Sequence, residues 1–226
     1  MQNIPDIKLG LVAVSRYCFP VELSKRRRDR LTEACKRRKI PLIKINTIIE
    51  NEKDVVKALQ EIEGKNVNAL AIYLGNFGPE DPVSLLAQKF VGPTMVIAAA
   101  EETGQDLISG RGDAYCGLLS TSFNMGLRKL STYMVESPVE EAKNLAKDIA
   151  DFLIIARIIQ GVSNLKIFSF GPRPQDFLTC HAPLQPLFDL GVEVMENSEL
   201  DLLEIVQAEQ DNPRIKEVVK EMSKEL

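Results

Sequence analysis

The sequence contains no tryptophan and only one histidine, and aromatic residues make up just 6% of its 226 positions. Aliphatic side chains must therefore supply most of the packing in any core. The scarcity of histidine also limits the chemistry. Cys116 follows a tyrosine in a way that suggests a nucleophile, yet a catalytic thiol needs a basic partner, and His181 is the only histidine. We therefore interpret Cys116, like Cys35, as a small core residue.

Cysteine pairs and long apolar runs are also missing. None of the four cysteines forms a C-x-x-C pair, and a chain of this size does not need disulfides, so the thiols are expected to be reduced. The segment 1–8 has no apolar run suited to a signal peptide, and no window approaches the ~20 apolar residues of a membrane span. We predict a cytoplasmic protein without a membrane partner.

The charge pattern argues against two classes of ligand. A net charge of −4 and a pI near 5.3 are atypical of a dedicated nucleic-acid binder. The expected first strand is not followed by G-x-G-x-x-G, which argues against a dinucleotide site. Segment 25–39 is strongly basic and segment 193–226 strongly acidic. This asymmetry could guide oligomer assembly, or it could reflect two solvated helix faces.

Apolar runs alternate with amphipathic segments over the first hundred residues. Continuous apolar strands separated by helices are typical of a parallel sheet covered on both faces. We predict an α/β fold with a doubly wound parallel sheet, Rossmann-like or flavodoxin-like. The expected strands are 9–14, 41–45, 69–74 and 94–99, and the expected helices are 23–38, 53–62 and 82–90.

The rest of the chain predicts two further helices and then the start of a second α/β unit. A helix is expected over 114–131, and a second over 138–159 that Pro138 opens and Gly161 closes. The second half of the latter helix is apolar almost all round, which predicts deep burial, for example between domains or subunits. Later strands are expected at 165–170 and 192–195, and later helices at 183–190, 198–207 and 213–224. We place an amino-terminal domain at 1–162 and an incomplete second domain at 163–226, because two strands are too few for a stable parallel sheet unless they extend the first one.

Polar side chains follow several of the expected strands. Parallel strands gather their carboxyl ends at one edge of the sheet, where ligands bind. Hydroxyl-rich ligands need the donors, acceptors and aromatic face that these side chains offer. The predicted binding residues are Arg16, Tyr17, Asn76, Glu101 and Arg111. The alternative is that the two arginines only form surface ion pairs with Glu80, Glu101 or Asp113.

No metal site or catalytic carboxylate pair can be assigned from the sequence. His181, Cys180 and Asp176 share one loop, but three groups in one loop rarely make a metal site by themselves, so we predict no metal ligands. Glu101 and Glu102 point to opposite sides if the backbone is extended, so they do not form an obvious acid–base pair. Catalytic residues remain unknown at this stage.

Five segments resemble the L-fucose/L-arabinose isomerase family in their amino-acid sequences and in their order along the chain. The similarity runs over essentially the whole chain. They are LGLVAVSRYCFP at 9–20, ALAIYLGNFGP at 69–79, RGDAYCG at 111–117, FGPRPQDF at 170–177 and ENSELD at 196–201. The resemblance is to the amino-terminal portion of proteins about twice this long.

The resemblance implies an aldose–ketose isomerase acting on a monosaccharide with Mn²⁺. In the family the metal ligands and the acid–base residues lie in the later part of the chain, so no cofactor is expected in this segment and it should be inactive alone. The family also implies a trimer or hexamer, in which the loop after the first strand, here Arg16 and Tyr17, contacts substrate. The alternative function is a non-catalytic sugar-binding or assembly module.

Overall fold

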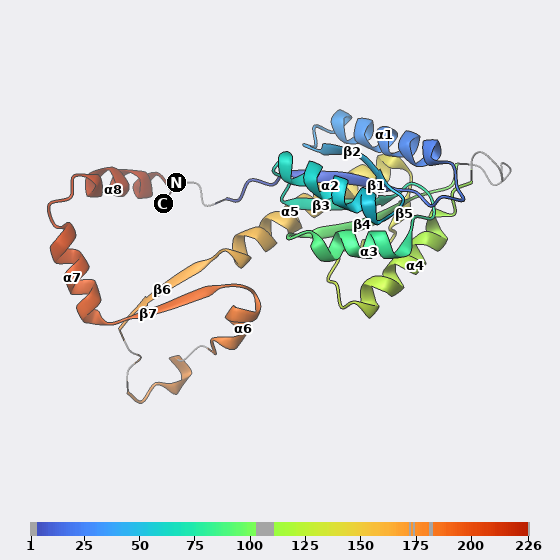
Figure 1. The fold of residues 1–226 in the computed structure, drawn as a ribbon. Coiled ribbons are helices and arrows are strands. Elements are labelled where there is room, and N and C mark those ends of the chain that lie inside the picture. Colours follow the sequence, from blue (N-terminus) through green and yellow to red (C-terminus); the bar gives the residue numbers. More distant parts are fainter. Residues whose placement is uncertain (1–3, 103–110, 172, 174, 181–182, 226) are drawn as a thin grey trace. The chain divides into compact units, whose positions relative to one another are not determined.

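The computed structural model describes residues 4–102, 111–171, 173, 175–180 and 183–225 (Figure 1). The chain divides into two units. One comprises Asp6–Ile159, and the other comprises the first five residues together with Gln160–Leu226.

Asp6–Ile159 contains a five-stranded parallel sheet. Its strands are β1 (Leu9–Val14), β2 (Ile43–Ile49), β3 (Ala69–Leu74), β4 (Thr94–Ala99) and β5 (Val139–Glu140). Their order is β2-β1-β3-β4-β5, and every pairing is parallel. Every residue of β1, β3 and β4 is buried, as their uninterrupted apolar sequences predict. The predicted doubly wound α/β fold is confirmed, with the flavodoxin-like strand order.

Helices cover both faces of this sheet. They are α1 (Val21–Arg37), α2 (Glu52–Gly64), α3 (Glu80–Lys89), α4 (Ala114–Leu127) and α5 (Ala142–Ser163). The chain steps from β1 to β2 in one direction and from β2 to β5 in the other. Right-handed crossovers then place α1 on the face opposite α2, α3 and α4. The contacts of α3 with both α2 and α4 agree with this arrangement (Figure 1).

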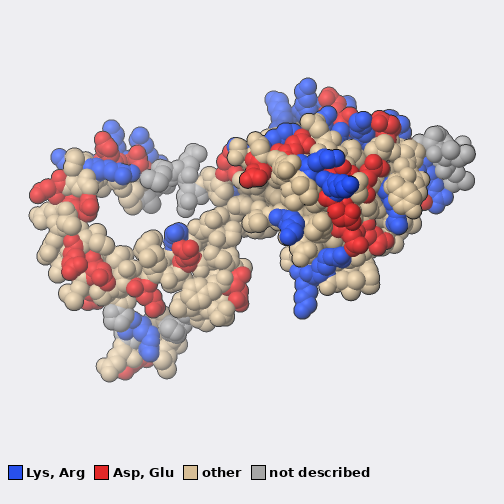
Figure 2. Space-filling model, viewed as in Figure 1, with Lys and Arg blue, Asp and Glu red and all other residues tan. Residues whose placement is uncertain are grey.

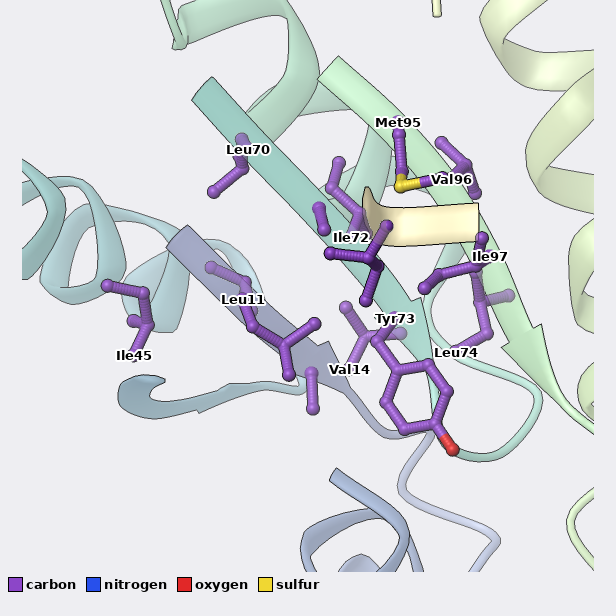
Figure 3. Close-up of a cluster of buried hydrophobic side chains, with 14 of the residues drawn as sticks. Leu11, Val14, Ile45, Leu70, Ile72, Tyr73, Leu74, Met95, Val96 and Ile97 are labelled. Atoms are coloured by element: carbon purple, nitrogen blue, oxygen red, sulfur yellow. The ribbon is translucent and has the colours of Figure 1, made fainter. Parts of the chain in front are cut away.

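The side chains of the three central strands build the core. Figure 3 shows Leu11, Ile72 and Val96, from β1, β3 and β4, within one apolar cluster. Tyr73 belongs to the same strand as Ile72, but its hydroxyl points out of this cluster. The Tyr73 ring therefore belongs to the apolar core, and its hydroxyl lies at the edge of that core.

The predicted helix over 138–159 is wrong at both ends. The Pro138 carbonyl accepts a hydrogen bond from Ala98 N (2.8 Å), and the Glu140 carbonyl accepts one from Ala100 N (3.0 Å). These groups serve the sheet, so the helix begins only at Ala142, and Gly161 does not end it. The second predicted strand also differs, because β2 occupies Ile43–Ile49 rather than 41–45.

The second half of α5 is buried along one stripe only. Phe152 and Ala156, four residues apart, are fully buried, whereas Ile154 and Ile158 are more than half exposed within this chain. Residues four apart share a helix face, so a single neighbouring sheet covers one stripe. The exposed stripe is thus not covered by the described residues of this chain, and its burial against another subunit stays a prediction.

The unit containing Gln160–Leu226 forms a separate two-stranded parallel sheet. Strand β6 (Lys166–Phe170) pairs with β7 (Glu193–Asn197), so these strands do not extend the first sheet. Ser198 caps α7 with a capping box. Among the described residues of this unit only Val192 is buried. The helical elements are the short 3₁₀ turn Leu178–Cys180, α6 (Gln185–Asp189), α7 (Glu199–Glu209) and α8 (Arg214–Glu225).

Candidate functional site

The loops after β1 and β3, residues 15–20 and 75–79, meet where the strand order reverses, which is the position where ligands usually bind in this fold. We refer to these two loops together as the crevice. The buried Asn76 side chain joins them. Its Oδ1 accepts from Arg16 N at 3.1 Å and from Gly78 N at 3.3 Å, while its Nδ2 donates to Ser15 Oγ at 2.8 Å. Because its amide is fully occupied, Asn76 fixes the shape of the crevice rather than presenting a free group to a ligand.

The guanidinium of Arg16 lies at the surface of this crevice. It sits 4.8 Å from the centroid of the Phe77 ring and 3.9 Å from a carboxylate oxygen of Glu80. The Phe77 ring in turn stacks on Phe19, with centroids 6.1 Å apart. The predicted alternative, an ion pair with Glu80, is thus present, but it is long and exposed and so holds Arg16 weakly. Tyr17 beside it is 86% exposed.

A buried arginine that the sequence analysis did not single out organises the neighbouring loops. Arg27 of α1 is 3% exposed, and its Nη1 donates to the Gly75 carbonyl at 2.8 Å. Its Nη2 donates to Glu101 Oε2, also at 2.8 Å. A sequence signal existed, because positions 23, 27, 31 and 35 recur every four residues and the other three are apolar.

Glu101 links Arg27 to the segment before α4. Its carboxylate also accepts a hydrogen bond from Gly112 N at 3.1 Å. Gly112 must be small here, since an added Cβ would lie 2.6 Å from Arg27 Nη1. Arg111 pairs with Asp113, as the alternative interpretation predicts, and its side chain is half exposed.

The five predicted residues thus lie at two connected positions: the loops after β1 and β3, and the contact between Glu101 and Gly112. Arg16 and Asn76 are in direct contact, and Tyr17 follows Arg16 in the same loop. Glu101 reaches the Gly75–Asn76 backbone through Arg27. Arg111 lies next to Gly112, which Glu101 binds. The loop after β6, which also has turn and polar residues, belongs to the other sheet.

The basic helix is not simply a solvated face. Arg28, like Arg27, is 3% exposed, and its guanidinium donates to the carbonyls of Ile45 and Asn46 at 2.9 and 3.0 Å. These bonds tie α1 to β2. The interpretation of the basic segment as a solvent-exposed helix face is therefore wrong for Arg27 and Arg28.

Cys35 and Cys116 differ in their surroundings. Cys35 is buried, and burial raises the pKa of its thiol to about 11, so it stays protonated at neutral pH. Cys116 is exposed, so its prediction as a core residue is wrong. It lies on a face of α4 that the core does not reach.

The described residues hold no group of three or more His, Cys, Asp or Glu side chains suited to a metal ion. Cys180 and Asp176 are both exposed, and His181, the third member of the predicted loop, lies outside the described residues. A Mn²⁺ ion therefore finds no fitting ligand set in the described part of the chain.

The family model described as fucose/sulfoquinovose isomerase, N-terminal domain, matches residues 10–163, which is more than half of the chain and covers the five-stranded sheet except Leu9, the first residue of β1. No curated protein matches the chain. None of the described helices is long and apolar enough to cross a membrane.

Proposed function

The chain belongs to the fucose/sulfoquinovose isomerase amino-terminal domain family, and on this premise we propose that it is the amino-terminal part of an aldose–ketose isomerase that contributes substrate and subunit contacts. The family match over residues 10–163 is the observation that carries this proposal. Its substrate is a monosaccharide, its location the cytoplasm and its assembly a trimer or hexamer.

The crevice after β1 and β3 supplies binding rather than chemistry. The weakly held Arg16 guanidinium offers several fixed donors to sugar hydroxyls, and the exposed Tyr17 ring offers a flat face to C–H groups. Asn76 keeps the Arg16 backbone in place for this contact. These residues bind and orient the sugar.

The proton transfers of the isomerisation need groups that this segment does not present. Moving hydrogen between C1 and C2 through an enediol requires an acid and a base at the reacting carbons, and an electrophile at the oxygens. In the described residues, Glu101 is committed to Arg27 and Gly112. Mn²⁺ ligands and the acid–base pair would therefore come from elsewhere in the full enzyme.

A kinetic experiment on the full-length isomerase that carries this domain tests the proposal. Arg16→Ala should lower kcat/KM for the sugar substrate by about tenfold, as expected for one charge-assisted hydrogen bond, and leave the melting temperature unchanged. Lys25→Ala is the matched control, because Lys25 is an exposed cation that pairs with Glu22 on α1. Unchanged kinetics in Arg16→Ala, or no aldose turnover by the full enzyme, would refute it.

The isolated 226-residue chain gives a second test. It should produce no ketose from L-fucose or L-arabinose, with or without Mn²⁺, and robust turnover would contradict the assignment of the chemistry to other residues.

A non-catalytic sugar-binding or assembly module is the second candidate. It is favoured by the lack of a metal-ligating cluster among the described residues. The full-length protein separates the two, because such a module would bind sugar and turn none over even when supplied with Mn²⁺.

A further inference from the structure

Helix α4 exposes a row of large apolar side chains at its surface. Four of them recur at every fourth residue and are between 56% and 67% exposed: Tyr115, Leu119, Phe123 and Leu127. Residues four apart share a helix face, and we call this row the α4 ridge. The buried side chains of α4, which include Leu118 and Met125, belong to the core instead, and α4 contacts α3 and β4 (Figure 1). The described residues therefore leave more than half of each ridge side chain uncovered.

The ridge lies on a helix without charge. No residue from Ala114 to Leu127 is charged, whereas Lys and Arg side chains crowd the surface over α1 (Figure 2). A surface helix of a monomer normally places polar and charged residues opposite its apolar stripe. The centre of a protein interface, by contrast, is depleted of charge and enriched in aromatic residues. The exposed face of α4 thus has the composition of an interface centre, and it offers a charged partner nothing to pair with.

Small residues border the ridge on both sides. Cys116 and Ser120 follow it on one side, and Ser122 and Gly126 on the other. A Cβ added at Gly126 would meet nothing within 4 Å, so the space beside the ridge is open there. When two helices pack, a ridge of residues four apart fits the helical groove beside the same kind of ridge, with a crossing angle of about −50°. A ridge with small residues on both sides is therefore complementary to a copy of itself.

The area of the ridge suits a pair of chains. The exposed parts of its four side chains amount to roughly 450 Å². A stable interface buries about 800 Å² on each partner, so the ridge supplies about half of that area and the small residues beside it extend it. An antiparallel crossing also brings the partially positive amino-terminal end of each helix toward the partially negative carboxyl-terminal end of the other.

We propose that the α4 ridge is the contact between two copies of this chain, which cross antiparallel about a two-fold axis near the middle of the helix. A second copy supplies the same uncharged ridge and the same small residues, so each ridge fits beside the other. In a two-fold contact each residue pair occurs twice, and Leu119 of either copy then lies against Phe123 of the other. This contact rests on the surface of α4 alone and not on the isomerase assignment.

Sedimentation velocity of the 226-residue chain over a range of concentrations tests the proposal. The parent chain should pass from monomer to dimer as its concentration rises. Phe123→Glu places a charge at the centre of the ridge and should raise the Kd of the dimer by about tenfold or more. Its melting temperature should stay that of the parent monomer, because the Phe123 side chain is exposed. Val56→Glu is the matched control, since Val56 is a similarly exposed apolar residue on α2, and its dimer Kd should equal that of the parent.

The exposed thiol of Cys116 gives a second measurement that needs no substitution. Cys116 lies beside the ridge, so its alkylation by iodoacetamide should slow severalfold once the chain is dimeric. Cys180, an exposed thiol of the other unit, should react at the same rate in monomer and dimer. Three results would overturn the proposal: a parent chain that stays monomeric at every concentration, equal dimer Kd values for Phe123→Glu and the parent, or a Cys116 that reacts equally fast in monomer and dimer.

Discussion

At the scale of single residues, two glycines in α4 have opposite surroundings. A Cβ on Gly117 would collide with the backbone carbonyl of Phe77, whereas a Cβ on Gly126 would meet nothing within 4 Å. Gly117 thus allows α4 to approach the loop after β3. In the sequence both glycines have the same local effect, a weaker helix, because a close approach of distant backbone leaves no local signal.

Gly117→Ala should lower the free energy of unfolding by about 2–3 kcal/mol, because the backbone of the crevice loop must move. Gly126→Ala should raise it by about 0.5–1 kcal/mol, since alanine is the better helix former. Chemical denaturation of both variants measures the difference. Equal stability of the two variants would mean that α4 does not approach Phe77 this closely.

Asn76 is a structural residue of the crevice. Asn76→Ala should reduce the free energy of unfolding by about 2 kcal/mol, because the Arg16 and Gly78 amides and the Ser15 hydroxyl lose their partner. Thermal or urea denaturation checks this. Asn68→Ala is the control, since the Asn68 amide also bridges distant backbone but at an exposed site, and its effect should be smaller.

At the scale of elements, a single carboxylate joins β2 to α2. Glu61 accepts hydrogen bonds from Asn46 N at 2.8 Å and Thr47 N at 3.1 Å, and pairs with Lys65 at 2.6 Å. Burial opposes ionisation of Glu61, but these donors outweigh it and lower its pKa from 4.5 to about 2. The charged form is therefore favoured in the folded chain.

This depressed pKa makes stability depend on pH. The contribution of Glu61 is fully present above pH 4.5, the unfolded value, and is lost as the pH falls through about 2. Glu61→Gln should remove about 2 kcal/mol at pH 7 and flatten the fall in stability between pH 4.5 and 2. Denaturation at several pH values checks the slope, and an unchanged slope in Glu61→Gln would contradict the assignment.

At the scale of the whole molecule, burial is concentrated in Asp6–Ile159. Nearly all buried apolar residues lie there, while the described part of Gln160–Leu226 buries only Val192. A segment with so little core has low local stability.

Limited proteolysis should therefore cut the chain between residues 165 and 225 first and leave a resistant fragment that ends near Ser163, the last residue of α5. A chain truncated after Ser163 should keep the melting temperature of the parent to within about 2 °C, because it loses almost no buried surface. Mass spectrometry of the fragments and calorimetry of the truncated chain measure these outcomes. A fall in melting temperature of 10 °C or more would show that the later residues support the core.

The sequence by itself determined the central strands and the local caps. The bounds of β1, β3 and β4 agree with the prediction residue for residue, because each is an apolar run whose burial on both faces follows from its composition. Ser198 likewise acts through neighbours three residues away. The loops that carry Arg16 and Asn76 follow from the rule that parallel strands share a carboxyl edge.

Only the tertiary structure decided which polar residues are buried and what they bind. Arg27 and Arg28 belong to a basic run, yet both are buried because their guanidinium groups donate hydrogen bonds to carbonyls that are distant in the sequence. Pro138 and Glu140 leave a helical pattern because β4 offers them backbone partners. Each outcome depends on groups far apart in sequence, and pairing between distant groups has no local pattern from which it could be predicted.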